Sequence, residues 1–240
     1  KNGSSSIQRA LQTRAWKCDS ISVAPQKELN ASALANSLIP TRNPKQYEAQ
    51  FSKKRKWVEN TDADLGIISA EFFSGAPPEA LLKALQDFMP AQADTARIIA
   101  YVRPHAGRAL SGYAQRVKTG AYKGTLSKFI NTLDNRSILQ YHARFDKWQK
   151  VFGDRFTLRP FVRDQLRDGD VIADFFYEAL QGAEFTLRTP ETANESLTLE
   201  EIAAMRVIQT GWIKDEMPKF LRLSLGAAIS IPAGFEKITD

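Results

Sequence analysis

The stretch ARIIAYV, residues 96–102, decides how the rest of the chain is interpreted. A second short apolar run, LGIISA, occupies residues 65–70. Runs of this length are typical of strands that are buried on both faces of a sheet. Between them the apolar residues of segment 81–88 repeat at helical spacing, with proline on both sides. A strand, a helix and a strand in this order predict a βαβ unit, and therefore a parallel sheet with a right-handed crossover.

The pattern after residue 102 predicts three more helices and one more strand. Helices are expected at 110–117, 138–152 and 171–180, and a strand at 155–161. Gly153 is expected to close the second of these helices, and Asp170 to cap the third. Thr198 and Glu201 form a capping box that predicts a further helix.

Composition excludes several classes of protein. The 240 residues are 43% apolar, which is enough for an ordinary buried core. The 33 Lys and Arg against 27 Asp and Glu leave a net charge of +6, which favours anionic partners mildly. Cys18 is the only cysteine and there are two histidines, so a disulfide framework and a four-ligand zinc site are excluded, and we expect no metal.

The chain is expected to be one cytoplasmic domain. No internal repeat and no low-complexity segment separates two cores, so residues 1–240 are predicted to form a single α/β domain with helical insertions and a helical C-terminal part. No apolar run approaches the length of a membrane span, and a single cysteine suits a reducing compartment. Residues 30–60 mix polar residues with Pro40 and Pro44, and we expect this stretch to be mobile.

The first residues have the composition of a phosphate-binding loop. They read KNGSSSIQ, residues 1–8, and lead into an apolar helical stripe at Ile7, Ala10 and Leu11. A glycine and hydroxyl residues at a helix N-terminus offer N–H and O–H donors together with the positive end of the helix dipole, and Lys1 adds a full charge. This combination suits a phosphate. The alternative is a serine-rich terminus without structure.

A second phosphate site is predicted where the strand 96–102 ends. Arg103 follows this strand, and Ser111 comes eight residues later, about two turns into the next helix. Ligands of open parallel sheets bind in the crevice outside the carboxyl ends of the strands. An arginine there, with a hydroxyl from the adjacent helix, can hold a phosphate by charge-assisted hydrogen bonds. Taken alone, an arginine at a strand end is more often a partner in a surface salt bridge.

With these two motifs the chain resembles the sulfotransferases that use 3′-phosphoadenosine 5′-phosphosulfate (PAPS). Their first signature is a Lys-x-Gly-Ser/Thr-Ser/Thr loop that holds the 5′-phosphosulfate, and the matching residues are Lys1, Gly3, Ser4, Ser5 and Ser6. Their second signature is a strand that ends in Arg with a Ser eight residues later, which binds the 3′-phosphate, and the matching residues are Arg103 and Ser111. The strand that precedes the loop in that family does not precede Lys1 in this sequence.

The resemblance extends to the bacterial, carbohydrate-type branch of that family. The segments that match this branch are 115–118, 141–148, 152–153, 159–161 and 194–197. The resemblance implies a P-loop-like three-layer fold, with a central, mostly parallel sheet flanked by helices. It also implies transfer of a sulfonate group from PAPS to an acceptor hydroxyl, here expected on a carbohydrate. In this reaction Lys1 would be the catalytic cation, and the three serines would stabilise the departing 5′-phosphate.

Glu71 is our choice for the general base. Members of the family place a His or a Glu at the equivalent strand end, and Glu71 directly follows the run 65–70. We expect Phe72 and Phe73 to surround Glu71 with apolar groups that favour its protonation. The alternative is a surface glutamate that caps the following helix. His105 is the other candidate base, although its position beside Arg103 favours a contact with the nucleotide.

Three further interpretations stay open. The basic run at residues 53–56, beside Trp57, invites a nucleic-acid interpretation, but such runs are usually a solvated face, and an anionic acceptor such as an acidic glycan is the better match. We therefore expect no nucleic-acid partner. A phosphate-loop kinase is a second possible function, although the chain opening lacks the Gly-x4-Gly-Lys-Ser/Thr spacing. A third is a non-catalytic relative that binds a nucleotide or a glycan.

Overall fold

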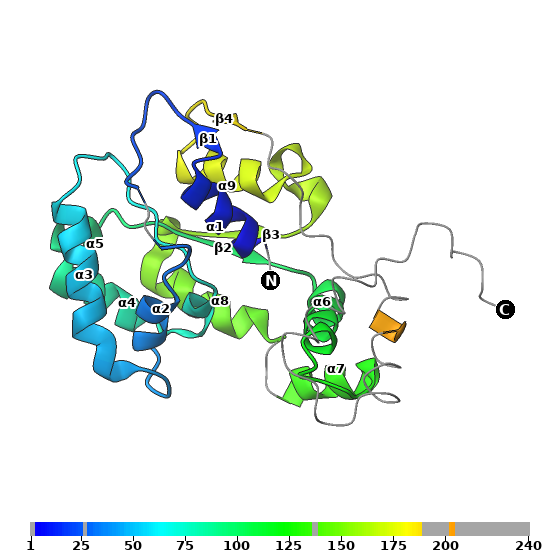
Figure 1. Ribbon diagram of the computed structural model, residues 1–240. Helices are drawn as coiled ribbons and strands as arrows, with labels where there is room; N and C mark the ends of the chain where they lie inside the picture. Colours follow the sequence, from blue (N-terminus) through cyan, green and yellow to red (C-terminus); the bar gives the residue numbers. More distant parts are fainter. Residues whose placement is uncertain (1–2, 26–27, 136–138, 189–201, 205–240) are drawn as a thin grey trace. The chain divides into compact units, whose positions relative to one another are not determined.

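The computed structural model describes residues 3–25, 28–135, 139–188 and 202–204 (Figure 1). Its α-helices are α1 (Ser4–Thr13), α2 (Ser32–Ser37), α3 (Tyr47–Glu59), α4 (Pro78–Phe88), α5 (Pro90–Ala93), α6 (His105–Lys118), α7 (Leu126–Asn135), α8 (Tyr141–Phe152) and α9 (Val171–Ala179). The strands are β1 (Trp16–Lys17), β2 (Ile98–Val102), β3 (Phe156–Pro160) and β4 (Thr186–Leu187). Short 3-10 helices are η1 (Pro44–Gln46), η2 (Glu71–Gly75), η3 (Gly153–Arg155), η4 (Arg163–Gln165) and η5 (Arg167–Gly169).

The chain divides into two compact units. The first unit comprises Lys1–Pro104 and Gln140–Ala193, and the second comprises His105–Leu139 and Asn194–Asp240. The four strands of the described residues all belong to the first unit. In the second unit α6 and α7 enclose a small core around Tyr113, Val117 and Phe129. The single domain over residues 1–240 stays a prediction.

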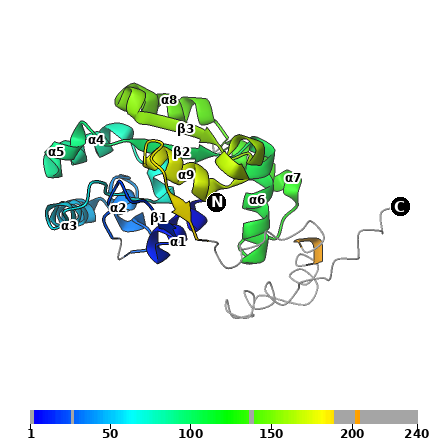
Figure 2. The same ribbon diagram turned by 90° about the horizontal axis from the view of Figure 1, so that it is seen from above.

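The strands β2 and β3 form a parallel pair, as the sequence pattern predicts for a sheet of this class. The register runs from Ile98 opposite Phe156 to Val102 opposite Pro160, and Figure 2 shows the two strands side by side. The backbone N–H of Phe161 extends the ladder by donating to the carbonyl of Val102 at 2.7 Å. Because parallel strands end at the same edge, the residues that follow β2 and β3 emerge together.

Helices cover both faces of β2. Its side chains alternate, so that Ile98 and Ala100 pack in a core with α4 and α8, while Ile99 and Tyr101 pack with α1 and α9. Figure 1 shows α1 and α9 above the two strands and α4 and α8 below them. The chain is therefore a mixed α/β structure with a parallel pair of strands inside helices.

The helices α1 and α9 follow the predicted patterns closely. Ile7, Ala10 and Leu11 are buried and form the inner face of α1. The carboxylate of Asp170 caps α9 by accepting hydrogen bonds from the backbone N–H groups of Ile172 (2.6 Å) and Ala173 (3.0 Å). Both predictions are confirmed, because a cap and an apolar stripe are local signals.

The strand expected at residues 65–70 does not form. Within this segment only Leu65 makes a β-bridge, an isolated parallel one with Val23. Its N–H donates to the carbonyl of Ser22, and the carbonyl of Ser69 accepts from Ala31 N–H at 2.8 Å. The hydrogen bonds of this segment therefore go to the irregular stretch before α2. The predicted βαβ unit is wrong, because residues 65–70 do not form a strand that pairs with 96–102.

Two further expectations need correction, and others fall outside the described residues. Residues 30–60, expected to be mobile, contain α2 and α3, and Phe51 is completely buried among the rings of Tyr47 and Phe88. Leu110 is exposed, because the inner face of α6 consists of Ala109, Tyr113 and Val117 instead. Ile138, Thr198 and Glu201 lie outside the described residues, and the helix expected from 138 begins at Tyr141.

Candidate functional site

The loop before α1 has the geometry of an anion-binding helix start. Gly3 adopts the left-handed conformation, with φ of 75°, and its carbonyl accepts from the N–H groups of Ser6 and Ile7 at 3.0 Å each. The N–H groups of Ser4 and Ser5 come earlier in the first turn. At this point of a helix no preceding turn supplies a carbonyl that could accept from them. The hydroxyls of Ser4, Ser5 and Ser6 occupy the same first turn, half-buried at Ser4 and Ser5 and exposed at Ser6.

Gly3 is packed so closely that any side chain at this position would displace its neighbours. A Cβ atom at this position would lie 2.8 Å from Cε2 of Phe161 and 2.8 Å from both methyl carbons of Val171. Contacts this short do not occur in folded proteins without movement of the neighbours. The loop backbone therefore rests directly on Phe161, the residue that follows β3.

Arg103 reaches the same ring from the end of β2. Its guanidinium carbon lies 4.6 Å from the centroid of the Phe161 ring, and the residue is half-buried. A guanidinium stacked on an aromatic ring is held in a defined plane while its N–H groups keep their in-plane directions. Gly3 and Arg103, which are far apart in the sequence, therefore share one aromatic neighbour at the carboxyl edge of the parallel pair.

Glu71 is joined to the loop by a direct hydrogen bond. The Ser4 hydroxyl donates to Oε1 of Glu71 at 2.6 Å, and the Gln8 amide donates to the Ser69 hydroxyl at 3.3 Å. Glu71 is exposed, so the expected enclosure by Phe72 and Phe73 is wrong. The reason is local, because Glu71 begins the 3-10 helix η2, which leaves Phe72 on the surface and turns Phe73 towards the α4 core.

The remaining predicted site residues lie elsewhere. Lys1 lies outside the described residues. Ser111 is half-buried on α6, and His105 donates from Nε2 to the carbonyl of Leu139 at 2.8 Å, both within the second unit. The structure thus brings together Gly3, Ser4, Glu71 and Arg103 within the first unit, while Ser111 and His105 belong to the other.

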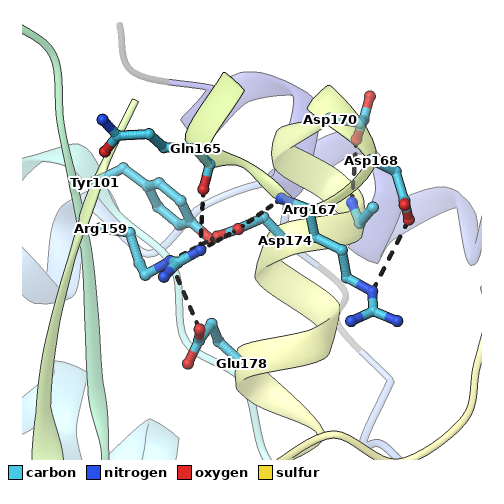
Figure 3. A network of polar contacts seen from close by, with 9 residues as sticks. Tyr101, Arg159, Gln165, Arg167, Asp168, Asp170, Asp174 and Glu178 are labelled. Carbon is cyan, nitrogen blue, oxygen red and sulfur yellow. Dashed lines mark hydrogen bonds and ion pairs between the residues drawn. The ribbon is translucent and has the colours of Figure 1, made fainter. Parts of the chain in front are cut away.

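A buried polar network lies under the same edge and was missed by the sequence analysis. The carboxylate of Asp174, 1% exposed, accepts from the Tyr101 hydroxyl at 2.6 Å and from Arg159 at 3.1 Å (Nε) and 2.5 Å (Nη2). The backbone N–H of Arg167 adds a bond of 2.9 Å, and Glu178 lies 3.6 Å from Arg159 (Figure 3). This network ties β2, β3 and α9 together.

The network fixes the charge of its members. Burial opposes ionisation of Asp174, but the hydrogen bonds from Arg159, Tyr101 and Arg167 outweigh it, so the pKa of Asp174 lies below its ordinary value. Burial, followed by the bond to Asp174, raises the pKa of Tyr101 well above its ordinary value. The signal that reveals this network is an acidic residue on the apolar stripe of a helix, since Asp174 lies between Val171 and Phe175 on the inner face of α9.

Outside this site, a cavity of about 750 Å³ opens between α9 and the strands β1 and β4, which form an antiparallel pair. Lys17, Asp19, Arg167, Asp168 and Glu184 place both signs of charge on its wall, and none of Gly3, Ser4, Glu71 and Arg103 lines it. Mixed charges of this kind give no preference for an anion. The cavity is therefore not part of the candidate site.

Comparison of the chain with protein-family models, with curated proteins and with solved structures found no match. Across the described ranges no helix is both long and apolar enough to cross a membrane. Within the same residues no group of three or more His, Cys, Asp and Glu side chains is placed to hold a metal ion. The interpretation of the site therefore depends on its own geometry.

Proposed function

We propose that the chain is a PAPS-dependent sulfotransferase with a P-loop-like three-layer organisation, acting on a hydroxyl of a carbohydrate. The observation that carries this proposal is the convergence of four residues, Gly3, Ser4, Glu71 and Arg103, at one edge of the first unit. The sequence and the family resemblance assign Gly3 and Ser4 to the 5′-phosphosulfate loop, Arg103 to the 3′-phosphate and Glu71 to the base. The helices on both faces of β2, and the start of α1 at the carboxyl edge of the parallel pair, support the proposed fold.

The donor set fits the two phosphate groups of such a ligand. The Gly3 backbone packs directly against Phe161 and Val171. The first turn of α1 that follows it offers the serine hydroxyls and the backbone N–H groups of Ser4 and Ser5 to the 5′ group. Arg103 would hold the 3′-phosphate with the planar face of its guanidinium against Phe161. For Lys1 and Ser111 the assignment to phosphate binding rests on the resemblance to the family alone.

PAPS supplies an activated sulfonate group when bound. Glu71 would accept the proton of the acceptor hydroxyl, while the acceptor oxygen forms the new bond to sulfur and the bond between sulfur and the 5′-phosphate oxygen breaks. The charge that develops on this phosphate would be stabilised by the hydroxyls of Ser4, Ser5 and Ser6 and by Lys1. Ser4 would thereby exchange its bond to Glu71 for one to the phosphate, which leaves the carboxylate open to the acceptor.

Calorimetric titration with the bisphosphate product, 3′-phosphoadenosine 5′-phosphate (PAP), tests the proposal. We expect metal-independent binding in the micromolar range, with an unchanged affinity when magnesium is added. Binding of a nucleoside triphosphate that requires magnesium, without binding of PAP, would identify the kinase instead. Binding of PAP with no sulfate transfer to any of a panel of oligosaccharides would indicate the non-catalytic relative.

We also propose a cellular location and a set of partners for the chain. Cys18 is the single cysteine, which suits the reducing cytoplasm. The partners are PAPS and the acceptor carbohydrate, and we propose no nucleic-acid or metal partner.

A further inference from the structure

We propose that Arg42, stacked on Phe72, forms an acceptor subsite for the acidic group of a charged sugar. The inference rests on the proposed function, because it places the subsite beside Glu71, the proposed base. It narrows the acceptor from a carbohydrate in general to an acidic one, whose carboxylate or sulfate pairs with Arg42.

The side chain of Arg42 is held in one position. Its guanidinium carbon lies 4.4 Å from the centroid of the Phe72 ring, and Nη1 donates to Oδ1 of Asn36 at 2.6 Å. Its backbone is held as well, since Arg42 N–H donates to the carbonyl of Ile39 at 2.9 Å. A group that is fixed before the ligand arrives loses little conformational entropy on binding.

The charge of Arg42 is not compensated. Among the described residues Arg42 forms no ion pair, and its sequence neighbours Thr41 and Asn43 are neutral. Two other exposed cations of the first unit do have acidic partners. Lys53 pairs with Glu28, and Arg55 lies 3.6 Å from Glu59. A planar guanidinium without an acidic partner presents a fork of donors that matches a carboxylate or a sulfate.

The position of this pair points to a sugar. Phe72 directly follows Glu71 in η2, and 38% of its surface is exposed, so the ring that carries Arg42 belongs to the residue after the proposed base. One acidic sugar carries a carboxylate and hydroxyls on the same ring, so it can present both to groups held by neighbouring residues, and its apolar C–H face can lie on an aromatic ring. The cation also offsets the repulsion that Glu71 would exert on an anionic acceptor.

Calorimetry on the full chain without any donor tests the subsite. The probes are a tetrasaccharide of alternating glucuronic acid and N-acetylglucosamine and the same tetrasaccharide after reduction of its carboxyl groups. We expect the acidic form to bind at least tenfold more tightly at low salt. Arg42→Gln should bring the two affinities within about twofold of each other. Arg55→Gln, the matched control for an exposed arginine of the same unit, should keep the preference.

The remaining outcomes overturn the inference or limit it. A preference that survives in Arg42→Gln, or no preference in the wild type, excludes the subsite. If a tetraglutamate peptide binds as tightly as the acidic tetrasaccharide and its binding also depends on Arg42, the subsite is not specific for a sugar. Failure of PAP to bind, together with an intact Arg42-dependent preference, excludes the proposed sulfotransferase while retaining the anionic subsite. Coincident urea unfolding midpoints of the wild type and Arg42→Gln confirm that the variant is folded.

Discussion

The hydroxyl of Ser4 and the carboxylate of Glu71 are joined by a hydrogen bond of 2.6 Å. Ser4 is the first residue of α1 and Glu71 the first residue of η2, so the bond connects the starts of two helical segments. In the proposed reaction one of these groups serves the donor and the other serves the acceptor. Donor binding and activation of the base would therefore be linked through the hydroxyl proton of Ser4, which can be donated either to Glu71 or to the phosphate.

Glu71→Gln should abolish sulfate transfer while leaving PAP affinity within about twofold. The amide keeps the size of the side chain and can still accept from Ser4, but it cannot take a proton from the acceptor. Transfer from PAPS and calorimetry with PAP measure the two effects. Glu79→Gln, an exposed glutamate of α4, is the control and should retain turnover. An equal loss of binding and turnover in Glu71→Gln would contradict the assignment of the base.

Arg103→Ala should weaken binding of the 3′,5′-bisphosphate more than binding of adenosine 5′-monophosphate. Loss of hydrogen bonds from a charged group costs about 1.5–3 kcal/mol, which corresponds to roughly ten- to a hundredfold in affinity. The ratio of the two dissociation constants is the measurement. Arg103→Lys, which keeps the charge, should recover part of the loss. An unchanged ratio in the alanine variant would remove Arg103 from the 3′ site.

Gly3→Ala should lower both stability and nucleotide affinity. A non-glycine residue at φ of 75° costs about 1 kcal/mol or more, and the added methyl would push Phe161 away from Arg103. Urea unfolding and calorimetry with PAP measure the two losses. Gly153→Ala separates them, because Gly153 also has a positive φ of 54° but has open space around its Cβ position. The control should lose stability and keep its affinity.

Asp174→Asn should destabilise the first unit by about 3 kcal/mol. The change removes the buried charge that balances Arg159 and leaves that guanidinium without its main partner. Urea unfolding measures the free energy of unfolding. Asp146→Asn breaks the exposed ion pair with Lys150 on α8, at 2.8 Å, and should change the stability little. Similar losses in both variants would show that the Asp174 network is not a special source of stability.

Acid should remove the contribution of Asp174. Its pKa in the folded chain is below the unfolded value of about 4, so the charged form stabilises the fold above this pH. The contribution falls as the pH drops through 4 and towards the lower folded value. The difference in the free energy of unfolding between wild type and Asp174→Asn should therefore be constant from pH 7 to pH 5 and shrink below it. A difference that grows with acid would contradict the direction of the shift.

Local signals made much of the fold predictable. The helix α4 lies between prolines and α9 carries its own cap, so both were expected at nearly their observed bounds. The strand β2 ends at Val102, where the apolar run of the sequence ends, and this was also expected. By contrast, the helix α3 was not expected. Only Phe51 of this helix is buried, so its sequence lacks the apolar stripe that predicts a helix. Pro44 nearby begins η1 at a position where proline is tolerated, so it does not interrupt the structure.

The relations between distant segments were not predictable from one sequence. The run 65–70 is apolar and lies next to the core, but its composition does not say that its hydrogen bonds go to residues 22–31 rather than to β2. Phe161 is one of 14 phenylalanines, and nothing in the sequence distinguishes it as the ring shared by Gly3 and Arg103. These features depend on long-range packing, which overrides local preference.

The contact of Gly3 with Val171 has a consequence for biosynthesis. A ribosome adds roughly 5–20 residues per second, so the glycine leaves the exit tunnel on the order of ten seconds before the valine against which it packs. During that delay the inner face of α1, with Ile7 and Leu11, has no α9 to cover it. The nascent chain should therefore be a client for chaperones until α9 emerges.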